Sequence, residues 1–310
     1  MKSIIRFTIY KFLLRTIWIA VLTTFGIQLL FTFLPPKRVH DPRSASKQEQ
    51  TVDRKWSSRN YLEWVTAILS GKPQISDQGS SSWMVREFKL RAANTLQLCG
   101  SAFLLAAFMG IIVGTIKTGL ESENISGPKK PLPRFLSNLS TVSLFALSSI
   151  PAYIIAYFLF LVLKSESNMF LAVIALVLGS GSAMDITRLT ANIHGQELQS
   201  KYVESALTSG LKTSGLLPLP GTVAWHAFRN SLITILPVIA YRLPLIVSSA
   251  LVVEVVFDLP GLGESLLSAL IQQDVPKVLM IILISVLFVQ VCMFIADLLS
   301  FVLHPQRYSD

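Results

Sequence analysis

The chain has 310 residues, of which 52% are hydrophobic and 15% are charged. An ordinary soluble domain carries more charge and fewer apolar residues, so the composition indicates an integral membrane protein. The net charge of +9 is attributed to membrane topology and contact with the lipid bilayer, and no nucleic-acid partner is expected.

Six stretches of the sequence are apolar over the roughly 20 residues that a helix needs to cross a bilayer. They are predicted at residues 13–34, 93–116, 135–163, 169–190, 232–253 and 278–303. Asp185 and Arg188 shorten the fourth span, and Arg242 interrupts the fifth. Pro237 and Pro244 are expected to bend the fifth span, because each removes a helix hydrogen bond. The prediction is an all-α membrane protein with six transmembrane helices.

The order of these spans divides the chain into three parts. Residues 1–34 are predicted to hold a cytoplasmic segment and the first helix, residues 35–91 an extracytoplasmic segment, and residues 92–310 a five-helix core. A short amphipathic helix is expected at 60–70, within the extracytoplasmic segment.

Basic residues near the first span predict the orientation of the chain. Lysine and arginine are enriched in short cytoplasmic segments, and four of them lie before or at the start of this span: Lys2, Arg6, Lys11 and Arg15. We therefore expect a cytoplasmic N-terminus, and six spans return the C-terminus to the same side. No small-residue cleavage site follows the first span, so it is expected to remain uncleaved.

A polar, helix-prone stretch lies in the loop near 194–230, between the fourth and fifth spans. It contains Glu204 and Ala206 and ends at Gly210. Ala206 and Gly210 are four residues apart, so we expect them on one helix face, where small side chains let another helix approach. Glu204 suits the N-terminal end of the helix dipole, and Gly210 is a good helix terminator. The stretch predicts a short docking helix.

Arg242 is the charge inside a span that most needs a partner. A charge near the middle of a membrane helix costs at least a few kcal/mol and generally faces a cavity or another protein surface. Three roles are open for Arg242: contact with a substrate, contact with a second subunit, or snorkelling to the membrane surface. Ser248 and Ser249 follow in the same span, and their hydroxyls can bond a helix carbonyl or a polar ligand. These three residues are the candidates for a translocation path.

The sequence contains no pattern that is typical of an enzyme. The run from Gly210 to Thr213 resembles the end of a phosphate-binding loop, but its glycine does not directly precede the lysine and no strand leads into it. No catalytic constellation is found. The four histidines lack ligand spacing, and Cys99 and Cys292 both fall inside predicted spans. We therefore expect neither a catalytic site, a metal nor a disulfide.

Five pieces of the sequence, in the same order, resemble the permeases of bacterial ABC importers. The run Glu204-Ser205-Ala206 with Gly210 resembles their EAA loop, and Tyr202 before it is similar to the dipeptide, oligopeptide and nickel permease family, B-type subunit. Glu254 and the turn residues Pro260, Gly261 and Gly263 are similar to that family's signature after the fifth span. The remaining pieces lie at 94–98, 149–151 and 297–299 with 305.

The resemblance covers nearly the whole chain and implies the type I ABC importer fold. Tyr202, Glu204, Ala206 and Gly210 would then form a cytoplasmic coupling helix that contacts an ATPase. The implied partners are a homologous second permease of the C-type, two ATPase subunits that hold ATP and Mg²⁺, and an extracytoplasmic substrate-binding protein. The chain itself would bind no cofactor and would move di- or oligopeptides across the bacterial inner membrane by alternating access.

Departures from the family pattern leave several functions open. Residues 214–221 look like an inserted turn at the expected ATPase contact. Uptake of nickel or antimicrobial peptides, or peptide export, by a member of this family would share nearly every feature of the sequence. A passive channel belongs to a different class and would need no docking helix, so dependence of ATPase binding on Gly210 separates the two.

Overall fold

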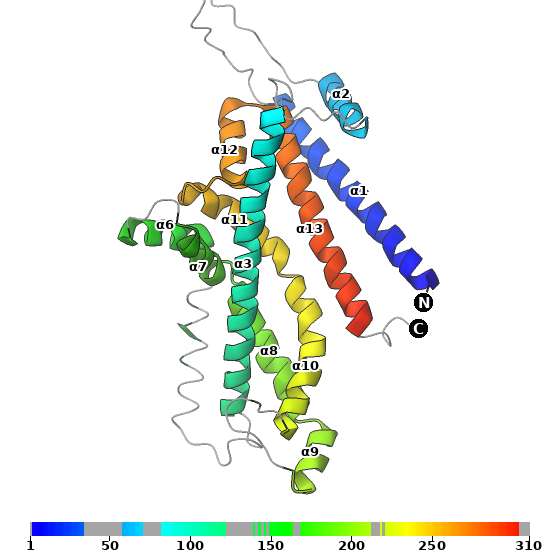
Figure 1. Ribbon diagram of the computed structural model, residues 1–310, viewed down its shortest axis with the longest axis vertical. Coiled ribbons are helices and arrows are strands. Elements are labelled where there is room, and N and C mark those ends of the chain that lie inside the picture. Colours follow the sequence, from blue (N-terminus) through cyan, green and yellow to red (C-terminus); the bar gives the residue numbers. More distant parts are fainter. Residues whose placement is uncertain are drawn as a thin grey trace, which may run out of the picture. The chain divides into compact units, whose positions relative to one another are not determined.

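The computed structural model describes residues 2–33, 58–70, 82–121, 149–163, 168–211, 218 and 221–303, with four single residues between 139 and 146. The regular elements of this described part are all α-helices (Figure 1), as predicted. They are α1 (Lys2–Phe33), α2 (Ser58–Leu69), α3 (Ser82–Glu121), α6 (Ala152–Leu163), α7 (Met169–Gly179), α8 (Ser182–Leu198), α9 (Lys201–Thr208), α10 (Val223–Ala240), α11 (Leu243–Val256), α12 (Leu262–Gln272) and α13 (Val275–Leu303).

Three helices of the described part are long and apolar enough to cross a membrane: α3, α10 and α13. The bent pair α7 and α8 passes the same test together and would be a fourth span. Shorter apolar helices lie at residues 14–30 of α1, in α6 and in α11. Six crossings therefore stay a prediction, and most of residues 135–148 of the predicted third span lies outside the described residues.

The fourth and fifth predicted spans are each broken into two helices. A single helix was predicted for the fourth span, and a bend at Pro237 and Pro244 was predicted for the fifth. Helices α7 and α8 are bent by 50° relative to each other, and Gly181 between them has a left-handed φ of 71°. The other break falls at Tyr241 and Arg242, between α10 and α11. Pro244 lies in the first turn of α11, where an N–H has no helical acceptor, whereas Pro237 lies inside α10.

The chain forms two compact units. The first comprises Met1–Ala93 and Pro260–Gln290, and the second comprises Asn94–Leu259 and Val291–Asp310. The predicted division at residues 34 and 91 follows membrane topology, which these compact units do not test, so it stays a prediction.

In the first unit, an apolar cluster holds α2 against α1 and α13. Trp64 of α2 is 2% exposed and lies in a buried cluster with Val275 and Leu279. The hydroxyls of Tyr61 and Thr24 share a hydrogen bond of 2.9 Å. The amphipathic helix predicted at 60–70 is thus confirmed as α2, and its apolar face packs against the protein.

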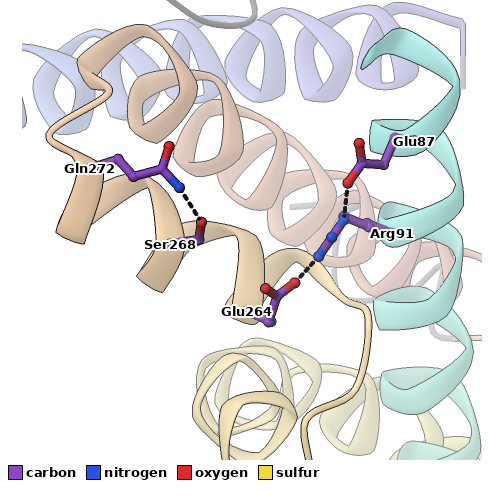
Figure 2. A network of polar contacts seen from close by, with 5 residues as sticks. All are labelled: Glu87, Arg91, Glu264, Ser268 and Gln272. Carbon is purple, nitrogen blue, oxygen red and sulfur yellow. Dashed lines mark hydrogen bonds and ion pairs between the residues drawn. The ribbon is translucent and has the colours of Figure 1, made fainter. Parts of the chain in front are cut away.

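A polar network joins the start of α3 to α12 within the same unit (Figure 2). Arg91 donates a hydrogen bond to Glu87, one turn earlier on α3, at 2.9 Å, and forms an ion pair with Glu264 in the first turn of α12. Further along α12, Gln272 donates to the hydroxyl of Ser268 at 2.9 Å. Because these side chains are partly exposed, the ion pairs position the two helices more than they stabilise the unit.

In the second unit, α8 packs along α10, and α6, α7 and α11 pack together (Figure 1). Helix α3 approaches α8 closely at two glycines. A Cβ atom added at Gly110 would lie 2.5 Å from the side chain of Ile186, and one at Gly114 would lie 2.6 Å from that of Thr190. These two glycines let the helices touch, as small residues do in membrane helix pairs.

Candidate functional site

The predicted docking stretch forms the helix α9, which follows α8 after a tight turn. The Ser200 carbonyl accepts hydrogen bonds from the N–H groups of Val203 and Glu204 at 3.1 and 3.2 Å, so the turn leads directly into the helix. Glu204 lies in the first turn of α9, where the helix dipole favours a negative charge. In Figure 1, α9 lies at the ends of α8 and α10.

Helix α9 has one buried and one exposed face. Val203 is 2% exposed and lies in a cluster formed by Leu198, Val223, Ala224 and Ala227, which belong to α8 and α10. Ala206 packs against the same cluster. Tyr202, Glu204 and Ser205 are exposed. The apolar face therefore attaches α9 to two long helices, and the polar face is presented outward.

Gly210 lies beyond the end of α9, so the prediction that it shares a helix face with Ala206 is wrong. Its φ is 83°, its N–H donates to the Leu207 carbonyl at 3.0 Å, and the Leu211 N–H donates to the Ala206 carbonyl at 3.2 Å. These two bonds form the Schellman motif, in which a left-handed residue ends a helix. Nothing lies within 4 Å of a Cβ atom added at Gly210. Among the described residues, the backbone conformation and no close contact accounts for the glycine.

Tyr202 connects α9 to both neighbouring helices. Its hydroxyl donates to the Glu197 carboxylate of α8 at 2.9 Å and accepts from the Asn230 amide of α10 at 3.3 Å. Partial burial and the hydrogen bond to Glu197 raise the pKa of Tyr202, so the hydroxyl is protonated at neutral pH. The sequence analysis missed both partners, because neither lies at a helical spacing from Tyr202.

A second group of polar residues lies at the two helix breaks of the second unit. Arg242 directly precedes α11, and its Nη1 atom lies 2.8 Å from Oδ2 of Asp185, in the first turn of α8. None of the three roles predicted for Arg242 included this partner in the same chain. The two residues belong to different predicted spans, so only the tertiary arrangement shows that the breaks meet.

Tyr241 adds a second polar contact at the same break. Its hydroxyl donates a hydrogen bond to Asp297 of α13, and both residues belong to the second unit. Two adjacent residues, Tyr241 and Arg242, therefore contact acidic side chains of two different helices. These two contacts fix the position of the chain between the end of α10 and the start of α11.

The other predicted path residues, Ser248 and Ser249, lie within α11. The Ser248 hydroxyl donates to the Pro244 carbonyl of its own helix at 2.9 Å. Both serines follow Arg242 by about two helical turns. Arg242 is thus at the break, and the serines lie further along the helix that begins there.

The predicted turn residues Pro260, Gly261 and Gly263 lie at the start of α12. Gly261 caps this helix with an extended backbone, and Gly263 lies in its first turn. The left-handed residue of the connection is Asp258, with a φ of 50°, and Leu259 donates to the Glu254 carbonyl at 2.9 Å. The sequence analysis missed Asp258, although aspartate is among the few residues besides glycine that accept this conformation.

Within the described ranges, no group of three or more His, Cys, Asp or Glu side chains is placed to hold a metal ion. Cys99 and Cys292 are buried free thiols. His194 is also buried, and its Nδ1 atom lies 3.2 Å from the hydroxyl of Ser231, which donates to the Ala227 carbonyl at 2.7 Å. This bond joins α8 to α10 just before the connection to α9.

Comparison with known proteins identifies the family. The chain is 23% identical to the oligopeptide transport system permease protein AppB of Bacillus subtilis, over 88% of this chain and 89% of that protein. It is 25% identical to the di/tripeptide transport system permease protein DppB of Pseudomonas aeruginosa, over 96% and 98% of the two chains. Residues 125–306, which include α9 and both helix breaks, match the family model of the binding-protein-dependent transport system inner membrane component. The chain belongs to this family of inner membrane transport components.

Proposed function

We propose that the chain is the B-type permease subunit of an ABC importer that moves di- or oligopeptides across the bacterial cytoplasmic membrane. The observation that carries this function is α9, a separate helix with an outward polar face, attached to two long helices. The relatives named for oligopeptide and di/tripeptide transport support the substrate class. The proposed partners are a second permease, two ATPase subunits and an extracytoplasmic binding protein.

Helix α9 is proposed to be the coupling helix, which docks on an ATPase subunit. Val203 packs against residues of α8 and α10, and Tyr202 forms hydrogen bonds to both helices. A displacement of α9 would therefore be transmitted to two helices at once. Helix α8 begins at one break and α10 ends at the other. ATP-driven movement of α9 would in this way reach the Arg242–Asp185 contact.

The proposed mechanism is alternating access. Closure of the ATPase subunits on ATP binding would shift α9, and the breaks would let the outer and inner halves of the spans move separately. This proposal includes six membrane crossings with both termini in the cytoplasm. Arg242, Ser248 and Ser249 are proposed to line the path, because they lie at and beyond the break where α11 begins.

Two substitutions at Gly210 test the docking role of α9. Any side chain at this position meets the same backbone strain, because φ is 83°, and a Cβ atom there would clash with none of the residues that the structure describes. Gly210→Ala is therefore the matched control for Gly210→Trp, and the two variants differ in bulk at the proposed contact. The assay compares ATP hydrolysis with peptide uptake in membrane vesicles that contain the assembled complex.

We expect Gly210→Ala to keep most of the uptake per ATP hydrolysed. Gly210→Trp should insert into the membrane normally, yet ATP hydrolysis should no longer drive uptake. Equal uptake by the two variants would show that the docking assignment is wrong.

A further inference from the structure

The ion pair between Arg242 and Asp185 joins the two interrupted helices of the second unit. We propose that it is a recognition site for the two charged termini of a peptide, in which Arg242 binds the carboxylate of the substrate and Asp185 binds its ammonium group. This inference rests on the proposed function, and it adds the chemical feature that the path recognises: a zwitterionic main chain.

Both side chains are partly exposed on the isolated chain, and Arg242 directly precedes the apolar helix α11. The side chains of Arg242 and Asp185 are 33% and 39% exposed. Ionised residues within membrane spans generally face a bundle interior or a water-filled cavity and mark substrate pathways.

The pair retains capacity for a ligand. The 2.8 Å contact joins one guanidinium nitrogen to one carboxylate oxygen. An arginine side chain carries five N–H donors and a carboxylate has two acceptor oxygens. A peptide carboxylate can therefore approach the outer donors of Arg242, and an ammonium group the second oxygen of Asp185, before the pair separates.

Opposite charges side by side select a dipolar ligand. A simple anion that binds Arg242 would leave the Asp185 carboxylate without its counter-charge, and a simple cation would leave Arg242 in the same state. Removing the counter-charge of a partly solvated ion pair costs free energy, although less than for a buried pair, whereas a zwitterion supplies a replacement for both. The site thus favours a peptide with free termini over a singly charged solute.

The length of the ligand connects recognition to movement. An extended chain spans about 3.3–3.6 Å per residue, so the termini of even a dipeptide are further apart than the 2.8 Å between Arg242 and Asp185. A peptide whose termini replaced each side chain as the other's partner would therefore separate Arg242 from Asp185. Because Asp185 lies in the first turn of α8 and Arg242 directly precedes α11, its binding would move the two breaks apart.

The test uses uptake of one short peptide in three forms by the complete transporter in proteoliposomes: with free termini, with an acetylated N-terminus, and with an amidated C-terminus. Asp185→Asn and Arg242→Gln each remove one charge, and the double variant leaves no unpaired charge behind. Arg188→Gln is the matched control, because Arg188 is an exposed cation one turn beyond Asp185 on α8. The same binding protein is used throughout, so its own preferences cancel in each ratio to the unchanged transporter.

We expect the unchanged chain and Arg188→Gln to prefer the peptide with free termini. Asp185→Asn should lower uptake of that peptide by about tenfold, the effect of one charged hydrogen bond, and change uptake of the acetylated form little. Arg242→Gln should likewise lower uptake of the peptide with free termini by about tenfold and change uptake of the amidated form little. The double variant should assemble and transport the three forms with similar rates.

An equal reduction of all three forms in the single variants, with the preference for free termini intact in the double variant, would show a purely structural ion pair and overturn the inference. The same change of preference in Arg188→Gln would also overturn it. Absence of ATP-dependent uptake of every form by the unchanged transporter would instead contradict the proposed function itself.

Discussion

Tyr202 shows how a single side chain sets the position of α9. The residue is 42% exposed, yet its hydroxyl forms hydrogen bonds to Glu197 and Asn230. The pair of bonds restrains α9 from both sides, because the partners come from α8 and α10. Sequence resemblance pointed to Tyr202, and the structure adds the physical reason for a tyrosine here.

The substitution Tyr202→Phe removes both hydrogen bonds and keeps the aromatic ring. Because the site is partly exposed to water, we expect a loss of stability of no more than about 1 kcal/mol, with faster amide hydrogen exchange in α9. Tyr157→Phe, at an exposed tyrosine of α6, is the control. Equal exchange rates in α9 for the two variants would contradict the bridging role.

Arg242 marks the limit of what the sequence could predict at this scale. The free-energy cost of placing its charge inside a span was apparent from the sequence, but its partner was not. Asp185 lies in another span, and which residues of two helices meet depends on packing that no spacing rule describes. Gly210 is the opposite case: it was predicted as a helix terminator, and its φ of 83° shows why.

The apolar face of α9 stabilises the attachment of this helix to α8 and α10. Val203→Ala removes two methyl groups from the buried cluster, which should destabilise the attachment of α9 by about 1–2 kcal/mol. Ser205→Ala, on the exposed face of the same helix, should change stability by less than about 0.5 kcal/mol. Protease sensitivity or hydrogen exchange of α9 in detergent measures the difference. If Ser205→Ala loosened α9 as much as Val203→Ala, the assignment of the two faces would be wrong.

The contact between α3 and α8 depends on the absence of side chains at two positions of α3. Gly114→Ala would bring a Cβ atom to 2.6 Å from Thr190 and 2.7 Å from the Thr187 carbonyl, so the helices must separate. We expect a loss of about 1–3 kcal/mol in unfolding free energy. Gly100→Ala, on the same helix with open space around it, should be neutral or slightly stabilising. Thermal unfolding in detergent compares them, and equal midpoints would refute the close contact.

The sequence predicted helices better than it predicted their interruptions. The amphipathic pattern at 60–70 gave α2 to within two residues, because the apolar face packs as its periodicity indicates. The break in the fourth span escaped prediction because hydropathy sums over about 20 residues and does not register a two-residue interruption. In the fifth span a bend was predicted from Pro237 and Pro244, and the break falls between them, with Pro244 in the first turn of α11.

At the scale of the molecule, the second unit contains a continuous mechanical connection. It runs from α9 through α8 and α10 to the two breaks, where Arg242 meets Asp185. One end of this connection presents a polar face outward, and the other holds two partly exposed charges at the helix breaks. Family membership and this connection together support an importer driven by partner ATPases.

The most direct measurement is uptake of a labelled short peptide by proteoliposomes that contain the chain with all proteins that co-purify with it and with its binding protein. We predict that a second permease and ATPase subunits co-purify, and that uptake requires both ATP and the binding protein. A chain that purifies alone, or that lets the peptide equilibrate without ATP, would contradict the account and indicate a passive channel.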